Sequence, residues 1–193
     1  MNSRERINTA LAHKQPDKLP VDFGSTAVTG IHVSSVYRLR QWYGLDKPKT
    51  PVKVTELYQM LGEIKEDLKE VLGCDVANVE SSSTAFGFLK ENWKKWYLDD
   101  GTPVLVPGLF NTEKNDDGSI YQYPMGDKNF PPSAKMPANG YFFDAIIRQE
   151  KFQESELNPQ DNICDFKLLS EHELKYIKEE VDRICSSTRY AIL

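Results

Sequence analysis

Cysteine is scarce in this chain, and its distribution excludes two kinds of small scaffold. The three cysteines, Cys74, Cys164 and Cys185, are odd in number and widely separated, and no Cys-x-x-Cys pair occurs. A disulfide-stabilised domain or a zinc ribbon requires paired or closely spaced cysteines. We therefore expect three reduced thiols that serve as packing residues.

Long apolar runs and an excess of basic residues are also missing. No uninterrupted apolar run approaches the roughly 18 residues that span a bilayer, and the first six residues lack the apolar core of a secretory signal. The 24 Lys and Arg residues are outnumbered by 29 Asp and Glu, for a net charge of -5, whereas nucleic-acid binders normally present a basic surface. We predict a cytoplasmic protein with neither a membrane nor a nucleic-acid partner.

Helical patterns dominate the first part of the chain. Apolar residues at helical spacing predict a short helix that has Ser3 as its N-cap and ends before Pro16. The same spacing predicts helices over 33–43 and 55–72. Gly73 follows the latter where a left-handed cap is expected.

The last part of the chain predicts a crossover helix that leads into a strand. A helix over 170–186 begins with Ser170 and Glu173, whose spacing fits a capping box in which each side chain bonds the other residue's backbone N–H. Short apolar runs predict three buried strands, over 19–23, 75–79 and 189–193. Alternation of strands and helices is typical of an α/β fold.

The middle of the chain has a different pattern. Two segment pairs flank Asp-Gly turns and predict antiparallel hairpins: 93–98 with 102–106, and 110–114 with 120–123. A loop rich in Pro, Gly and Asn and an aromatic run follow, over 124–140 and 141–143. We expect a single domain, 1–193, in which 89–143 is a hairpin-rich insertion and 149–161 is a linker-like surface segment.

The opening of the chain resembles a known superfamily. Residues 3–24, from SRERI to ALAHKQPDKLPVDFG, are similar to the start of the uroporphyrinogen decarboxylase superfamily, which also contains the cobamide- and corrinoid-linked methyltransferases. Four further stretches resemble a methyltransferase-like branch of it: TGIHVS at 29–34, TAFGF at 84–88, DGTP at 100–103 and PSAKMP at 132–137. The resemblance covers essentially the whole chain.

This resemblance implies a (β/α)8 TIM-type barrel with its active site at the carboxyl ends of the strands. Three predicted strands are too few to close such a barrel. We therefore expect the N-terminal portion of a barrel, carrying an antiparallel hairpin insertion, that forms an incomplete domain and is not active alone. The alternative is a complete small domain that ends in a strand.

Residues at the carboxyl ends of the first two predicted strands, and His32 after the loop that follows the first, are the candidates for a site. Asp22 and Glu80 are candidate catalytic carboxylates, whose pKa burial would raise toward the working range, and His32 is a candidate proton carrier. The candidate substrate-binding residues are Phe23, Gly24, Ser25, Ser81 and Ser82. Each catalytic candidate also has a structural interpretation: the carboxylates as solvated or capping groups, and His32 as the cap of the helix that follows it.

One difference between this sequence and the superfamily pattern makes one of the possible functions less favoured than another. Uroporphyrinogen decarboxylases have an arginine-bearing segment after the first strand that resembles a clamp for substrate carboxylates, whereas the matching residues 24–30 contain no cation. We therefore expect a cobamide- or corrinoid-linked methyltransferase type of enzyme, with a small-molecule, corrinoid or tetrapyrrole substrate and a corrinoid protein as possible partner. A tetrapyrrole carboxy-lyase is the second hypothesis, and a non-catalytic truncated or split subunit is the third.

The methyltransferase branch implies a zinc site built from His-x-Cys and a distant Cys, which lowers the pKa of a thiol acceptor. No matching set occurs here, so we expect no metal or other cofactor in this chain and any zinc site in a later part of the barrel. Aromatic residues of the predicted hairpins are open to two interpretations, as a stacking surface for a flat macrocycle or as cross-strand pairs. They are Trp93, Trp96, Tyr97, Tyr121 and Tyr123.

Overall fold

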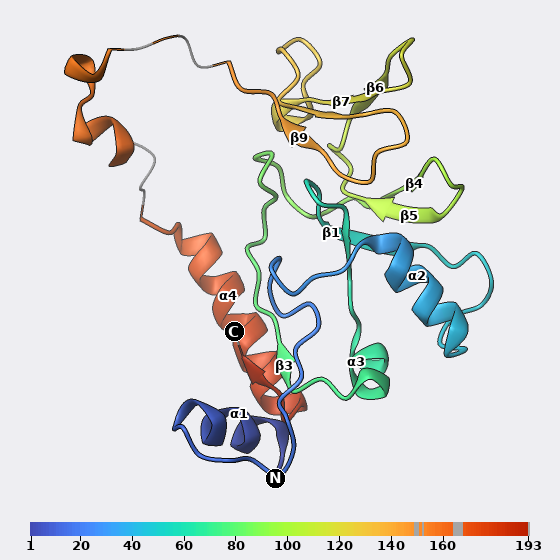
Figure 1. The fold of residues 1–193 in the computed structure, drawn as a ribbon, viewed down its shortest axis with the longest axis vertical. Helices are drawn as coiled ribbons and strands as arrows, with labels where there is room; N and C mark the ends of the chain where they lie inside the picture. Colours follow the sequence, from blue (N-terminus) through green and yellow to red (C-terminus); the bar gives the residue numbers. More distant parts are fainter. Residues whose placement is uncertain (149–150, 152, 164–167, 193) are drawn as a thin grey trace.

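The computed structural model describes residues 1–148, 151, 153–163 and 168–192 of this mixed α/β chain (Figure 1). Its α-helices are α1 (Ser3–Leu11), α2 (Val33–Trp42), α3 (Glu66–Leu72) and α4 (Glu171–Ser187). The first five strands are β1 (Val52–Glu56), β2 (Leu61–Gly62), β3 (Val76–Ala77), β4 (Lys94–Tyr97) and β5 (Pro103–Val106). The others are β6 (Thr112–Lys114), β7 (Ile120–Gln122), β8 (Ala134–Met136), β9 (Asp144–Ala145) and β10 (Ala191–Ile192).

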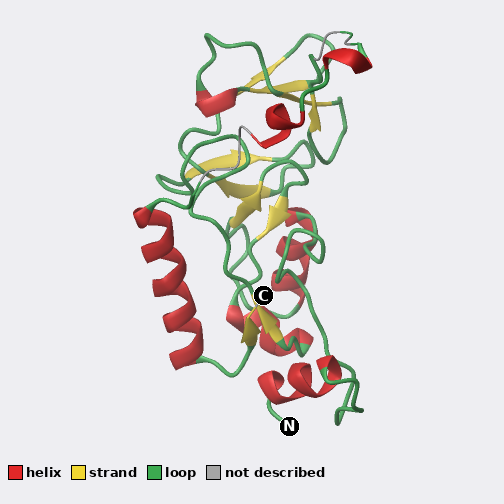
Figure 2. Ribbon diagram, turned by 90° about the vertical axis from the view of Figure 1, so that its left-hand side faces the viewer, coloured by secondary structure: helices red, strands yellow, loops and turns green. Residues whose placement is uncertain are grey.

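At one end of the elongated molecule, β3 and β10 form a parallel pair that α1 and α4 flank (Figure 2). Ala191 pairs with Val76 and Ile192 with Ala77, so the predicted crossover from the last helix into a strand is confirmed over these residues. The predicted strand over 19–23 is not formed. Its Val21 nevertheless lies against the start of β3, because the Asp75 N–H donates to the Val21 carbonyl oxygen at 2.7 Å.

Buried charges attach α1 to this pair of strands. Arg6, only 7% exposed, donates to the side chains of Asp75, itself 1% exposed, and of Asp17. The Asp75 carboxylate also accepts from the Val21 backbone N–H at 3.0 Å. Because a buried charge is costly unless it is paired and hydrogen-bonded, this cluster fixes one arrangement of α1, segment 17–21 and β3.

A second sheet has the strand order β2-β1-β5-β4. The hairpin of β4 and β5 was predicted, and it joins the rest of the fold because β5 pairs with β1 in parallel. Helix α2 packs against β1 and β2, where a Cβ on Gly62 would lie 2.8 Å from Val36 Cγ2 and 3.0 Å from Val33 Cα. Gly62 therefore permits a close approach of helix and strand that a larger residue would prevent.

The predicted helix over 55–72 is wrong in its first half. Residues 52–56 and 61–62 form β1 and β2 instead, and only α3 is helical. The apolar residues that suggested a helix are nevertheless buried, among them Leu57 at 2% and Met60 at 0% exposure. Val52 and Val54 face the core with Lys53 between them, an alternation of period two that competes with the helical period. The left-handed cap at Gly73, with φ of 69°, is confirmed.

The third sheet is antiparallel, in the order β6-β7-β8-β9. Its first hairpin was predicted, whereas β8 lies in the expected loop 124–140 and β9 begins just after the aromatic run. Phe110 links this region to the second sheet through edge-to-face contacts with Trp96 and Phe143, at centroid distances of 5.6 and 5.9 Å. One apolar core thus extends across both larger sheets.

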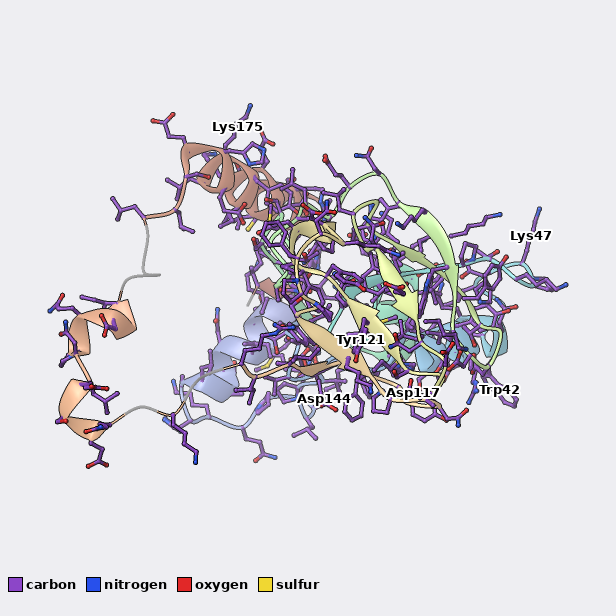
Figure 3. The ribbon with its side chains drawn as sticks, turned by 90° about the horizontal axis from the view of Figure 1, so that it is seen from above. Trp42, Lys47, Asp117, Tyr121, Asp144 and Lys175 are labelled. Atoms are coloured by element: carbon purple, nitrogen blue, oxygen red, sulfur yellow. The ribbon has the colours of Figure 1, made fainter. Side chains whose placement is uncertain are left out.

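Between β9 and α4, the described residues form two short 3-10 helices, η2 (Glu154–Glu156) and η3 (Pro159–Ile163). They lie apart from the sheets and from α1 when the molecule is viewed from above (Figure 3). Gln149, Glu150 and Phe152 of the predicted linker-like segment fall outside the described residues.

The described residues contain three separate sheets and no closed barrel. Within these same ranges, every helix is too short or too polar to cross a bilayer.

Candidate functional site

A cavity of about 680 Å³ lies beyond the carboxyl end of β3. Its walls come from the loop after segment 19–23, the end of β2, α3, the residues that follow β3, and α4. Two of the predicted site residues, Gly24 and Glu80, contribute to these walls. The volume falls within the roughly 300–1,000 Å³ typical of small-molecule sites.

The loop that supplies Gly24 is held by its own hydrogen bonds. The Asp22 carboxylate accepts from the Ser25 backbone N–H at 3.1 Å and from the Ser25 hydroxyl. Gly24 has φ of 75°, and its N–H donates to the Thr29 carbonyl oxygen at 3.0 Å. Asp22 thus acts here as a turn-stabilising group, which is its structural interpretation, while Ser25 is fully buried. Phe23, at 37% exposure, lies on the surface of the loop.

Glu80 lines the cavity as an ion-paired carboxylate. It accepts from Asn78 Nδ2 at 2.6 Å and forms an ion pair with Lys90. Asn78 and Lys90 line the same cavity. These two donors hold the Glu80 carboxylate in one orientation in the cavity wall, where it is a charged acceptor.

The serines after Glu80 connect the site to α4. The Glu173 carboxylate accepts from the Ser82 backbone N–H at 3.1 Å and from the Ser82 hydroxyl at 2.5 Å, and this hydroxyl lowers the pKa of Glu173. The predicted N-cap of Ser170 is confirmed, because its hydroxyl oxygen accepts from the Glu173 N–H at 3.1 Å. The prediction that the Glu173 side chain bonds the Ser170 backbone N–H is wrong, because the Glu173 side chain binds Ser82 instead. Ser81 lies 3.0 Å, Oγ to Oγ, from Ser83.

His32 lies away from this cavity, at the start of α2. It is the N-cap of that helix, with Nδ1 3.3 Å from the Ser34 backbone nitrogen and Nε2 3.0 Å from the Tyr141 carbonyl oxygen. Nε2 must carry the proton to donate to a carbonyl, which leaves Nδ1 as the acceptor. Burial lowers the pKa of His32. It borders a smaller pocket of about 210 Å³ that Trp96 and Met136 also line.

The hairpin aromatics make local contacts. Trp96 packs edge to face on Phe110, and Trp93 lies under Lys53, whose Nζ is 4.8 Å from the ring centroid. Tyr123 donates its hydroxyl to Glu113 at 2.6 Å, which raises the Tyr123 pKa to about 12. Tyr121 lies beside Lys135, and Tyr97 is 61% exposed.

The cavity is rich in charge, with equal numbers of both signs. Its cationic residues are Lys53, Lys65, Lys69, Lys90 and Arg183, and its acidic residues are Glu63, Glu66, Asp67, Glu80 and Glu180. Most are engaged: Arg183 bonds Glu66 and Glu180, and Asp67 pairs with Arg40. The wall therefore provides donors and acceptors without a large net charge.

Two residues that the sequence patterns did not single out remain unpaired in this wall. Lys69 is only 9% exposed, and its Nζ makes neither a hydrogen bond nor an ion pair within the described ranges. The Tyr190 ring lies beside it, with its centroid 5.8 Å from Nζ. Glu63 Oε2 is buried and has no hydrogen-bond partner among the described residues. The sequence signal that could have identified Lys69 is its position on the buried side of α3, whereas no such signal marks Glu63.

No group of three or more His, Cys, Asp or Glu side chains among the described residues is arranged to hold a metal ion. Cys74 is buried and Cys185 is exposed. Cys164 lies outside the described residues.

Comparisons with known proteins provide no family for this chain. No family model matches it, and neither the curated proteins nor the solved structures include a match.

Proposed function

We propose that this chain is the N-terminal portion of a cytoplasmic, TIM-barrel enzyme of the uroporphyrinogen decarboxylase superfamily, of the corrinoid-linked methyltransferase type. The observation that carries the proposal is the cavity beyond the carboxyl end of β3, which has Gly24 and Glu80 in its wall. In a (β/α)8 barrel the substrate pocket lies at that end of the strands. The parallel pairing of β3 with β10, reached through α4, supports the same architecture.

In this proposal, the residues of the chain bind and orient a substrate. Lys90 and Asn78 hold the Glu80 carboxylate in place, so that Glu80 accepts a hydrogen bond from the substrate. The turn at Gly24 closes one side of the pocket, and its positive φ makes glycine the residue that fits there. Zinc ligands and the methyl-transfer chemistry itself are assigned to parts of the enzyme outside this chain.

A uroporphyrinogen carboxy-lyase is the second candidate. The five cationic side chains of the cavity favour an anionic substrate, which the cation-free segment 24–30 did not lead us to expect. However, five acidic residues lie in the same wall, and an extensively carboxylated tetrapyrrole would be repelled by them. We therefore rank this activity below methyl transfer, and a non-catalytic subunit third.

A binding experiment on the 193-residue chain tests the proposal. Titration with methylcobalamin, followed by the change in its visible absorption and by calorimetry, is expected to give saturable binding. Gly24→Val introduces a side chain at positive φ that would meet Ile64 Cδ1, at 2.7 Å from the Cβ position, and is expected to weaken binding at least tenfold. Gly101→Val, at positive φ in an open turn, is the matched control and should bind normally.

Two results would count against the proposal. Release of carboxyl groups from uroporphyrinogen by the chain would establish the carboxy-lyase instead. Absence of cobalamin binding by a folded chain would favour the non-catalytic subunit.

A further inference from the structure

Two unpaired, oppositely charged side chains line the same cavity. Lys69 Nζ lacks a hydrogen bond or ion pair within the described part of the chain, and Glu63 Oε2 is buried there without a partner. Buried polar groups are usually hydrogen-bonded, and buried charges are usually paired. Glu63 Oε2 is one such exception, and Lys69 in the same wall is a charged residue that is only 9% exposed and has no ionic partner among the described residues.

The described surroundings of Lys69 do not provide such a partner. The lysine lies on α3, and desolvation lowers its pKa, with Glu66 and Asp22 too distant to form an ion pair with it. Arg183 opposes its charge from α4. The Tyr190 ring, 5.8 Å from Nζ, lies near the outer limit of about 6 Å for a cation–π contact and offers no hydrogen-bond acceptor in that geometry.

Glu63 lines the same cavity from the segment between β2 and α3. Its backbone N–H donates to the Lys53 carbonyl oxygen at 2.9 Å, so the residue is attached to the edge of β1 directly after β2. The four other acidic residues of the wall have partners: Glu66 and Glu180 bond Arg183, Glu80 bonds Lys90, and Asp67 bonds Arg40. Glu63 is therefore the acidic group of this wall whose carboxylate makes neither a hydrogen bond nor an ion pair within the described residues.

We propose that the cavity binds a small zwitterionic amino-carboxylate, with its carboxylate on Lys69 and its ammonium group on Glu63. Such a ligand supplies the acceptor that Lys69 Nζ lacks and the donor that the Glu63 carboxylate lacks. The balanced charge of the wall fits a ligand without net charge. The assignment deepens the proposed function by naming a substrate class, and it rests on that function only for calling the cavity a substrate pocket.

A length series tests the pairing, because it does not depend on knowing the natural ligand. Glycine, β-alanine, 4-aminobutyrate and 6-aminohexanoate are titrated into the chain by calorimetry, together with butyrate and butylamine. One amino-carboxylate of the series is expected to bind at least tenfold more tightly than either single-charge probe. Equal binding of butyrate or butylamine, or no binding of any probe, would overturn the proposal.

Variants assign the two ends of the ligand. Lys69→Met is expected to remove the advantage over butylamine, and Glu63→Gln to remove the advantage over butyrate, each by at least tenfold. Lys14→Met and Glu70→Gln, at an exposed lysine and an exposed glutamate outside the cavity, are matched controls that should retain binding.

Folding is checked by circular dichroism, and Lys69→Arg provides a charged variant if Lys69→Met does not fold. Loss of binding in the control variants to the same extent would refute the assignment. The probes contain no corrinoid, so a positive result here and a negative one with methylcobalamin would separate the two proposals.

Discussion

Replacing Asp75 by Asn is expected to destabilise the whole β3–β10 end of the molecule. The side chain is 1% exposed and accepts from Arg6 Nη1 and from the Val21 N–H. Its backbone also bonds both neighbours: its N–H donates to the Val21 carbonyl oxygen, and its carbonyl oxygen accepts from Ala191 N–H at 3.0 Å. One residue thus connects α1, segment 17–21 and β10.

The magnitude follows from what asparagine cannot do. The asparagine amide has only one oxygen, so its NH2 group must face either the Arg6 N–H or the Val21 N–H. Two donors then face each other, and one buried donor is left without an acceptor. Loss of a charge-assisted hydrogen bond costs about 1.5–3 kcal/mol, and an unsatisfied buried group adds about 1–3 kcal/mol. Asp17 retains its bonds to Arg6 at 2.7 and 3.1 Å, so we expect a total in the lower part of the summed range of about 2.5–6 kcal/mol, at about 3 kcal/mol.

Thermal unfolding measures this effect. For a domain of this size, about 3 kcal/mol corresponds to a fall in Tm of roughly 6–12 °C. Asp116→Asn, at an exposed aspartate in a turn, is the matched control and is expected to leave Tm nearly unchanged. If both variants melt at the same temperature, the buried cluster does not hold α1 and β3 together, and our explanation of this end of the fold fails.

Three further predictions concern other elements. Burial lowers the pKa of His32 below its ordinary value of 6.5, so at acidic pH the unfolded chain binds more protons at this residue than the folded chain does. The free energy of unfolding should therefore fall as the pH drops from 7.5 toward 5.5. In urea titrations, His32→Asn, which retains a capping side chain, should reduce this dependence on pH. Ser170→Ala removes the N-cap of α4 and should cost about 1 kcal/mol by urea unfolding, whereas Ser35→Ala, at an exposed serine, should cost less. Gly126→Ala puts a Cβ 2.2 Å from the Leu109 carbonyl oxygen at φ of 72°, so it should lower Tm or prevent folding; an unchanged Tm would contradict this contact.

Local signals correctly predicted several elements. The helix over 33–43 and the Gly73 cap depend on neighbours within a few residues, and so do the two Asp-Gly hairpins. The N-cap at Ser170 is of the same kind. At the start of the chain the local signal was off by one residue, since Asn2 rather than Ser3 caps α1 and forms the capping box with Glu5.

Predictions from local patterns were wrong where pairing with a segment far along the chain decided between a helix and a strand. The helix predicted from residue 55 onward has the apolar pattern of a helix, yet pairing with β5 and packing against α2 select the strands β1 and β2 over 52–56 and 61–62. The strand β8 is similar, because its pairing with β7 stabilises a segment that proline and glycine marked as a loop. Strand formation depends on partners far along the chain, which a period within one segment does not contain.

In the candidate site, too, some features follow from the sequence and others only from the tertiary structure. The sequence determined that small and acidic residues follow the first two predicted strands, and Gly24 and Glu80 do line one cavity. Only the tertiary structure decided that Asp22 is committed to a turn and His32 to a helix cap, because their partners satisfy them there. It also decided that Lys69 and Glu63 line the same cavity without a partner among the described residues, since burial and pairing are properties of the assembled walls.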